Sequence, residues 1–201
     1  MSSPATPEPP LAPPGAGLPK LELFIARRLF AARCRLTSRA AALELIASER
    51  AALDALARSC DPPAAAKRVL IPRPRGLEDS SRYWSVYMTL EHLRIVNDGV
   101  AATIRELVAG RAPPGVASTA SVKPSPTVTN TVLMAFDQSC ANLLAAGSDA
   151  ASLRTPVRYT HPWFGPLDAA KWLVLGGMHL GLHRRQIHAI RSTLGAPEPA
   201  R

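Results

Sequence analysis

The sequence predicts an all-α protein: a four-helix bundle with an extra N-terminal helix and long connecting loops. Apolar residues recur at steps of three and four in five separate stretches, which is the pattern of amphipathic helices. Clusters of proline and glycine separate these stretches. No segment alternates apolar and polar residues convincingly enough to indicate a strand. The 201 residues are enough for one domain of ordinary size with tails.

The N-terminal third of the chain is expected to hold a tail and two helices. Residues 1–18 are rich in proline and small residues, so we expect a disordered tail. Residues 19–36 carry the first helical pattern, including Phe24 and Leu29, and are predicted to form an accessory helix. A break at "TSR" provides a new N-cap for the second helix, which we expect to end near Ser59, before "DPP".

A proline-rich connector over residues 61–79 precedes the next predicted helix. We expect that helix to cover about residues 82–109, with Ser80 or Ser81 near its cap, and to stop at Gly110.

The C-terminal half is expected to contain two further helices. Residues 110–126 form a long loop, and such loops in compact domains are usually functional or partly disordered. A helix is predicted over about residues 127–146, and an extended segment over residues 150–166. Asp168 is the expected N-cap of the last helix, residues 169–194. We therefore predict one bundle domain over residues 37–195, followed by a short C-terminal tail over residues 196–201.

The composition argues against several classes of protein, namely disulfide-linked, membrane-spanning and nucleic-acid-binding ones. The three cysteines are widely spaced and form no CxxC pair, which argues against a disulfide framework and for a reducing, cytoplasmic setting. The N-terminus lacks the features of a signal peptide, and no apolar run approaches the roughly 18 residues of a membrane span, so we expect a soluble protein without a membrane partner. The net charge is +9, but the cations are scattered, so a nucleic-acid partner is not expected.

Histidines are concentrated in the last predicted helix, in the stretch "GMHLGLHRRQIHAI". His179 and His183 are four residues apart and lie on the apolar stripe, about 40° from each other around the helix. His188 is about 180° from His179 and cannot share its site. Two imidazoles at this spacing suit a single metal ion. The alternative is that they are hydrogen-bonded core residues.

A third inward-facing histidine favours the metal interpretation. His92 lies on the apolar face of the helix predicted over residues 82–109. Three buried imidazoles without partners would be costly, and one divalent cation satisfies all of them. His161 is expected either to form a structural hydrogen bond or to contact the metal site from outside, and Gln186 either to tie two helices together or to hold substrate.

These motifs resemble the DinB-like metal-dependent proteins of the DinB/YfiT superfamily. The resemblance is carried by "YWSVYMTLEHL", "HPWFGPL" and "HLGLHRRQI", and it covers roughly residues 38–194. It implies a bundle of up-down-down-up topology, and a zinc or nickel ion bound by His92, His179 and His183. No family counterpart is assigned to residues 1–36.

The resemblance implies an enzyme that uses its metal on a small-molecule substrate. Three histidine ligands leave a tetrahedral ion one open position, which can activate a low-molecular-weight thiol for transfer to a small electrophile. It can equally activate water for hydrolysis. A non-enzymatic, stress-related binding or scaffold role is the third alternative. Glu91 and Asp98 are the carboxylates nearest to His92 in sequence, and the lack of an obvious general base favours thiol transfer. A homodimer that pairs through an exposed helix face is also expected.

Overall fold

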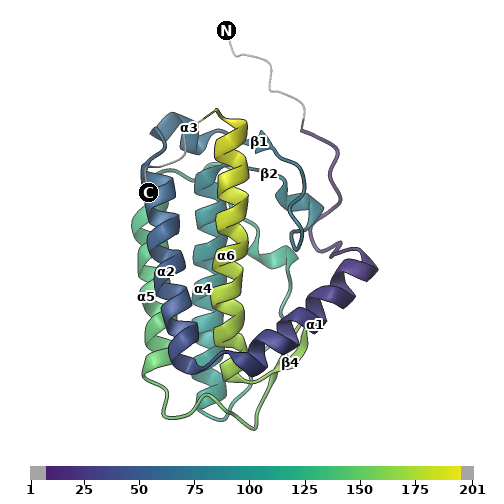
Figure 1. Ribbon diagram of the computed structural model, residues 1–201, viewed down its shortest axis with the longest axis vertical. Coiled ribbons are helices and arrows are strands. Elements are labelled where there is room, and N and C mark those ends of the chain that lie inside the picture. The colour runs from purple at the N-terminus through teal and green to yellow at the C-terminus, as the bar shows by residue number, and fades with distance from the viewer. Residues whose placement is uncertain (1–7, 196–201) are drawn as a thin grey trace.

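Four long helices form the bundle in the computed structural model, which describes residues 8–195 (Figure 1). Two of them, α2 and α6, run in one direction, and the other two run in the opposite direction (Figure 1). The predicted up-down-down-up four-helix bundle is therefore confirmed. The helices are α2 (Arg39–Arg58), α4 (Val86–Val108), α5 (Val132–Ser148) and α6 (Ala169–Thr193).

Three of the four bundle helices begin at a side-chain cap. The side chains of Ser38, Ser85 and Asp168 each accept a hydrogen bond from the backbone N–H three residues later, which satisfies one of the free donors at a helix N-terminus. The predictions for the starts of α2 and α6 are thus correct.

The start of α4 differs from the prediction. Its cap is Ser85 rather than Ser80 or Ser81, and the two residues before it, Tyr83–Trp84, form strand β2. β2 pairs antiparallel with β1 (Val69–Leu70). Aromatic and β-branched residues favour such extended pairing, so the apolar pattern of α4 was wrongly extended through them.

Short strands also occur where none was expected. β3 (Tyr159–His161) and β4 (Gly165–Leu167) form a hairpin just before α6. The extended conformation predicted for this segment is correct, but its pairing with itself was missed. The connector between α2 and α4 holds, in addition to β1, a short helix α3 (Pro62–Ala66) and a 3-10 turn η1 (Asp79–Ser81).

α4 and α5 lie side by side and run in the same direction, so the chain must travel back along the bundle between them (Figure 1). Residues 109–131 make this return and include a second 3-10 turn, η2 (Ala120–Val122). α5 consequently begins at Val132, later than the predicted residue 127.

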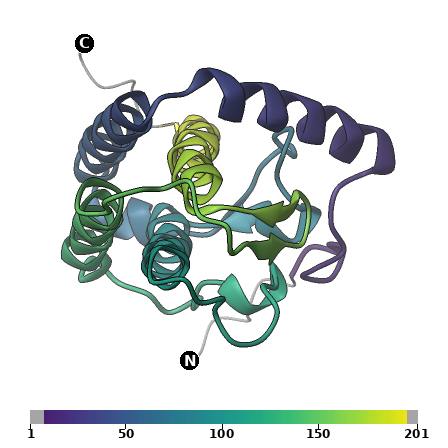
Figure 2. The same cartoon turned by 90° about the horizontal axis from the view of Figure 1, so that it is seen from below.

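The accessory helix α1 (Lys20–Leu36) lies outside the bundle, beside α6 and the hairpin that precedes it (Figure 2). It is attached through Phe30, whose ring centroid lies 4.4 Å from that of Phe164, and through an ion pair between Glu22 and Arg73. Much of its apolar surface remains exposed: Leu21 is 72% exposed and Leu29 is 64% exposed.

The described part of the N-terminal tail makes specific contacts, which differs from the expected disorder. The backbone N–H groups of Ala12 and Gly15 donate hydrogen bonds to Asp79 and Glu78. Residues 1–7 of that tail, and the predicted C-terminal tail of residues 196–201, lie outside the described residues.

Segments outside the bundle cover one side of α4 and α6 (Figure 2). We call them the covering segments: α1, residues 75–81, residues 117–123 and the hairpin of residues 159–167. The bundle core itself is apolar and dense, and its fully buried side chains include Leu90, Ile104, Phe136, Leu143, Leu180 and Ile187. Within residues 8–195, no helix is long and apolar enough to cross a membrane.

Leu143 provides a test of this packing. It is fully buried on α5 and lies against Gly176 of α6. Leu143→Ala should lower the free energy of unfolding by about 3 kcal/mol, because it removes apolar contacts and leaves a cavity. Met134→Ala, on the same helix but at a position that is 75% exposed, should change it by about 0.5 kcal/mol or less. Urea unfolding followed by circular dichroism measures both, and equal effects would contradict this description of the core.

Candidate metal centre

α4 and α6 bring the three predicted histidines together. His92 lies in the second turn of α4, and His179 and His183 lie on one face of α6. The Nε2 atom of His179 is 3.2 Å from that of His92 and 3.1 Å from that of His183. His92 and His183 are buried, whereas His179 keeps partial exposure.

Hydrogen bonds on the outer ring nitrogens fix two of the tautomers. His92 Nδ1 lies 2.7 Å from the carbonyl oxygen of Val122, and a carbonyl can only accept. His92 therefore carries its proton on Nδ1. Its Nε2 then presents a lone pair to the other two rings.

Gln186 has the same effect on His183. Its amide nitrogen donates to the carbonyl oxygen of Ser81 at 2.7 Å, which turns its Oε1 toward His183 Nδ1, 2.6 Å away. His183 must therefore donate from Nδ1 and present its Nε2 lone pair inward. The side chain of Gln186 is fully buried, so it both ties α6 to the segment before α4 and orients an imidazole.

The donor set fits a divalent cation. Nitrogens around a tetrahedral zinc ion lie about 3.3–3.4 Å apart, given zinc–nitrogen bonds of about 2.0–2.1 Å, and the Nε2 separations are close to this. Among the described residues, His92, His179 and His183 form a group whose potential ligand atoms all lie within 4.8 Å of one another. Outer hydrogen bonds of the kind made by Val122 and Gln186 are typical of metal-bound histidines.

Burial keeps the histidines neutral, as metal ligands must be. Desolvation lowers the pKa of His92 from 6.5 to about 4. It lowers the pKa values of His179 and His183 well below 6.5, with the charges of the neighbouring histidines acting in the same direction. His179 Nδ1 has no hydrogen-bond partner among the described residues.

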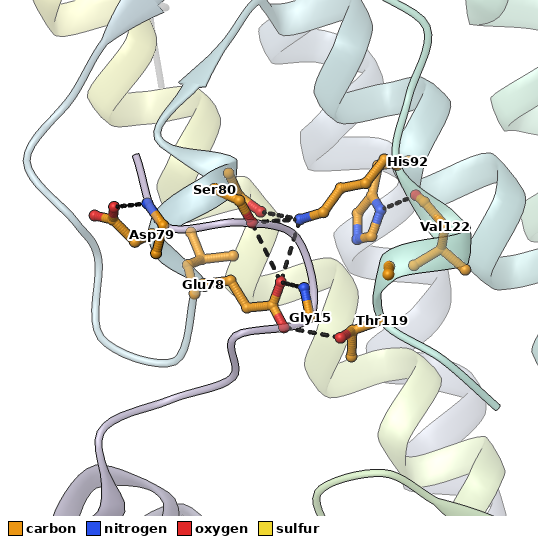
Figure 3. A network of polar contacts seen from close by, with 12 residues as sticks. Gly15, Glu78, Asp79, Ser80, His92, Thr119 and Val122 are labelled. Carbon is orange, nitrogen blue, oxygen red and sulfur yellow. Dashed lines mark hydrogen bonds and ion pairs between the residues drawn. The ribbon is translucent and has the colours of Figure 1, made fainter. Parts of the chain in front are cut away.

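A polar network holds the loop that supports His92 (Figure 3). The ammonium group of Lys123, the residue after Val122, lies 2.8 Å from Ser80 Oγ and 3.3 Å from a carboxylate oxygen of Glu78. Glu78 also accepts hydrogen bonds from Gly15 N–H and the Thr119 hydroxyl (Figure 3). These bonds, together with the charge of Lys123, lower the pKa of the Glu78 carboxyl even though burial, the largest single influence, raises it.

The histidines face a cavity of about 460 Å³ between α4, α6 and the covering segments. An aromatic wall lines one part of it, formed by Phe30, Tyr159, His161, Trp163, Phe164 and Trp172. His161 belongs to this wall rather than to the histidine cluster. It stacks on Phe164 at 5.0 Å, accepts a hydrogen bond from the backbone N–H of Trp163, and has its pKa lowered to about 4 by burial.

The carboxylates nearest to His92 in sequence do not line this cavity. Glu91 and Asp98 both pair with Arg94. Glu78 lines it instead, but its oxygens are occupied by the network described above. Glu78, Lys123 and the carbonyl of Val122 were missed from the sequence. The length of the loop over residues 110–126 was a signal for Val122 and Lys123, whereas the connector that contains Glu78 gave none.

The lowered histidine pKa values predict a pH-dependent stability in the metal-free protein. Between pH 6.5 and about 4, the unfolded chain binds protons that the buried imidazoles do not, so the free energy of unfolding should fall as the pH falls. The expected loss is roughly 1 kcal/mol per histidine between pH 6.5 and 5.5. Urea unfolding in the presence of a chelator measures the slope, which should be shallower in His92→Gln. An unchanged slope in that variant would contradict the prediction.

Comparisons with known proteins agree with this fold. The family model of the DinB superfamily matches residues 70–187, from β1 into the last turns of α6, and includes all three histidines. Among solved structures, the chain is similar to the crystal structure of TT2238, described as a four-helix bundle protein. The two are 26% identical, with a TM-score of 0.56, over 76% of this chain and 99% of that one. No curated protein matches the chain. The chain belongs to the DinB superfamily.

Proposed function

We propose that the protein is a metal-dependent enzyme that transfers a small thiol to an electrophilic substrate, with zinc or nickel held by His92, His179 and His183. The observation that carries the proposal is the convergence of three neutral imidazoles on the wall of a largely apolar cavity. The ion would supply the positive charge that lowers the pKa of a thiol and favours its nucleophilic thiolate.

The chain's own residues suit transfer better than hydrolysis. Neither Glu91 nor Asp98 lines the cavity, and Glu78 is already bound by Lys123 and Thr119. Within residues 8–195, the cavity lining therefore offers no free carboxylate to activate water as a general base. The covering segments and the apolar lining limit the access of water, which favours a thiol as the nucleophile.

The aromatic wall suits an apolar electrophile. Trp163, Phe164 and Trp172 offer ring faces and edges for stacking. The indole N–H of Trp172 is buried and has no acceptor among the described residues, so it can donate a hydrogen bond to a carbonyl or nitro oxygen of the substrate.

Metal binding is the first prediction of this proposal. The purified protein should contain about one zinc or nickel ion per chain by inductively coupled plasma mass spectrometry, and His179→Ala should lose it because two histidines do not hold the ion tightly. Gln186→Leu should lower the metal affinity by about 10–100-fold, because His183 loses its orienting partner. Gln138→Leu changes an exposed glutamine on α5 and should have no effect. If the purified protein contained no metal and were nevertheless fully stable, the proposed metal site would be wrong.

Thiol transfer is the second prediction. With chlorodinitrobenzene, a carbon–sulfur bond should form as chloride leaves with its electron pair and the thiol proton passes to the buffer. Glutathione, cysteine, bacillithiol and mycothiol serve as the thiol panel, and the absorbance of the thioether measures the rate. At least one thiol should give turnover that His183→Ala abolishes.

The outcomes of that assay separate the three functional classes. Thiol-independent cleavage of an ester or amide by the metal-loaded protein would identify a hydrolase instead. A bound ion without turnover in either assay would indicate a non-enzymatic binding role.

A further inference from the structure

On α6, the residues that line the cavity run from Trp172 to Arg185; His179 lies near the middle of this stretch, and His183 lies closer to Arg185. At 1.5 Å per residue, His179 lies about 10 Å from Trp172 and about 9 Å from Arg185 along the helix axis. We call the end of the cavity near Trp172 the aromatic arm and the end near Arg185 the second arm.

The second arm carries unpaired positive charge. Four side chains with a formal charge line the cavity, namely Arg75, Glu78, Lys123 and Arg185. Glu78 and Lys123 form an ion pair at 3.3 Å. This leaves Arg75 and Arg185, both exposed, neither of which makes a hydrogen bond or ion pair with a residue in the range 8–195.

The fold places these two arginines on the same part of the cavity. Gly76, next to Arg75, approaches α6 so closely that a Cβ on it would lie 3.3 Å from a methyl group of Leu182. Arg185 follows Leu182 by three residues, which is about one helical turn. The charge of Arg75 acts on the carboxylate of Glu22, but Glu22 is already bound by both terminal nitrogens of Arg73. The hydrogen bond from Arg73 is the main cause that lowers the pKa of the Glu22 carboxyl, and the charge of Arg75 contributes least.

We propose that Arg75 and Arg185 bind a carboxylate of the thiol substrate, so that the thiol is an acid-bearing one and enters by this arm. Guanidinium groups form strong charge-assisted hydrogen bonds with carboxylates. If the carboxylate of a tripeptide-sized thiol is bound by the two arginines, its sulfur can reach the histidine cluster. The aromatic arm then remains free for the electrophile. This assignment rests on the proposed function for the identity of the ligand as a thiol, whereas the preference for an acid rests on the two arginines.

Binding of unreactive probes tests the assignment without requiring turnover. S-methylglutathione and its dimethyl ester differ in their carboxylates and share the rest of their structure. Isothermal titration calorimetry on both metal-loaded and chelator-treated protein should give an affinity about tenfold higher for the acid than for the ester. The double variant Arg75→Gln/Arg185→Gln should reduce that ratio to about twofold or less, and Arg35→Gln, an exposed arginine of α1 outside the cavity, should preserve it.

Each contrary result overturns the assignment. Equal affinities for acid and ester, no binding of either probe, a preference that survives in the double variant, or an equal loss in Arg35→Gln would each do so. The proposed function fails separately: an acid preference without any thiol transfer would retain the anion site and reject the transferase. Transfer in which 2-mercaptoethanol has the same KM as glutathione would retain the transferase and reject the acid-binding arm.

Discussion

Three imidazoles can lie against one another in a largely buried site only if they are neutral, and hydrogen bonds on their outer nitrogens decide how the rings are oriented. This constraint organises the region around the histidine cluster. Val122 supplies one partner from the loop between α4 and α5, and Gln186 supplies another from α6 itself. Each fixes a ring so that its Nε2 lone pair points toward the other rings, which is an arrangement that could hold a metal ion.

The covering segments depend on a second buried polar group. Glu78 is 5% exposed and accepts hydrogen bonds from Gly15 in the N-terminal segment and from Ser80 in its own turn. It also accepts hydrogen bonds from Thr119 and Lys123, which lie in the loop between α4 and α5. A buried carboxylate is costly unless such partners surround it. The contacts of Glu78 therefore fix how these three stretches of chain, which are distant in sequence, meet near the histidines (Figure 3). This role in positioning does not require the contacts to add much net stability.

The helices and the histidine trio could be predicted because helical periodicity is a local signal. The i, i+4 spacing alone brings His179 and His183 together, and the apolar stripe of α4 assigns His92 to a buried face. Asp168 was recognisable as a cap for the same reason.

The missed features depend on partners distant in sequence. Tyr83 and Trp84 continue the apolar pattern of α4 but pair with β1 instead. Glu78 and Lys123 are 45 residues apart and look like ordinary surface charges until the loop brings them together. The helical periodicity of the sequence also predicts that the histidines face the bundle core. In the structure they lie instead on the side of α6 that the covering segments enclose. The periodicity of a sequence does not predict which part of the fold a long loop will pack against.

The parallel arrangement of α4 and α5 has a consequence for how such a protein can change. Residues 109–131 must span the bundle without forming a long helix, so their backbone carbonyls are free to face the cavity, and one of them orients His92. Loops tolerate changes in length and sequence that a packed core does not. The orientation of His92, and part of the cavity wall, are therefore set by a segment that can vary while the four helices stay the same. The shape of the cavity can thus change in this fold without any change to its core.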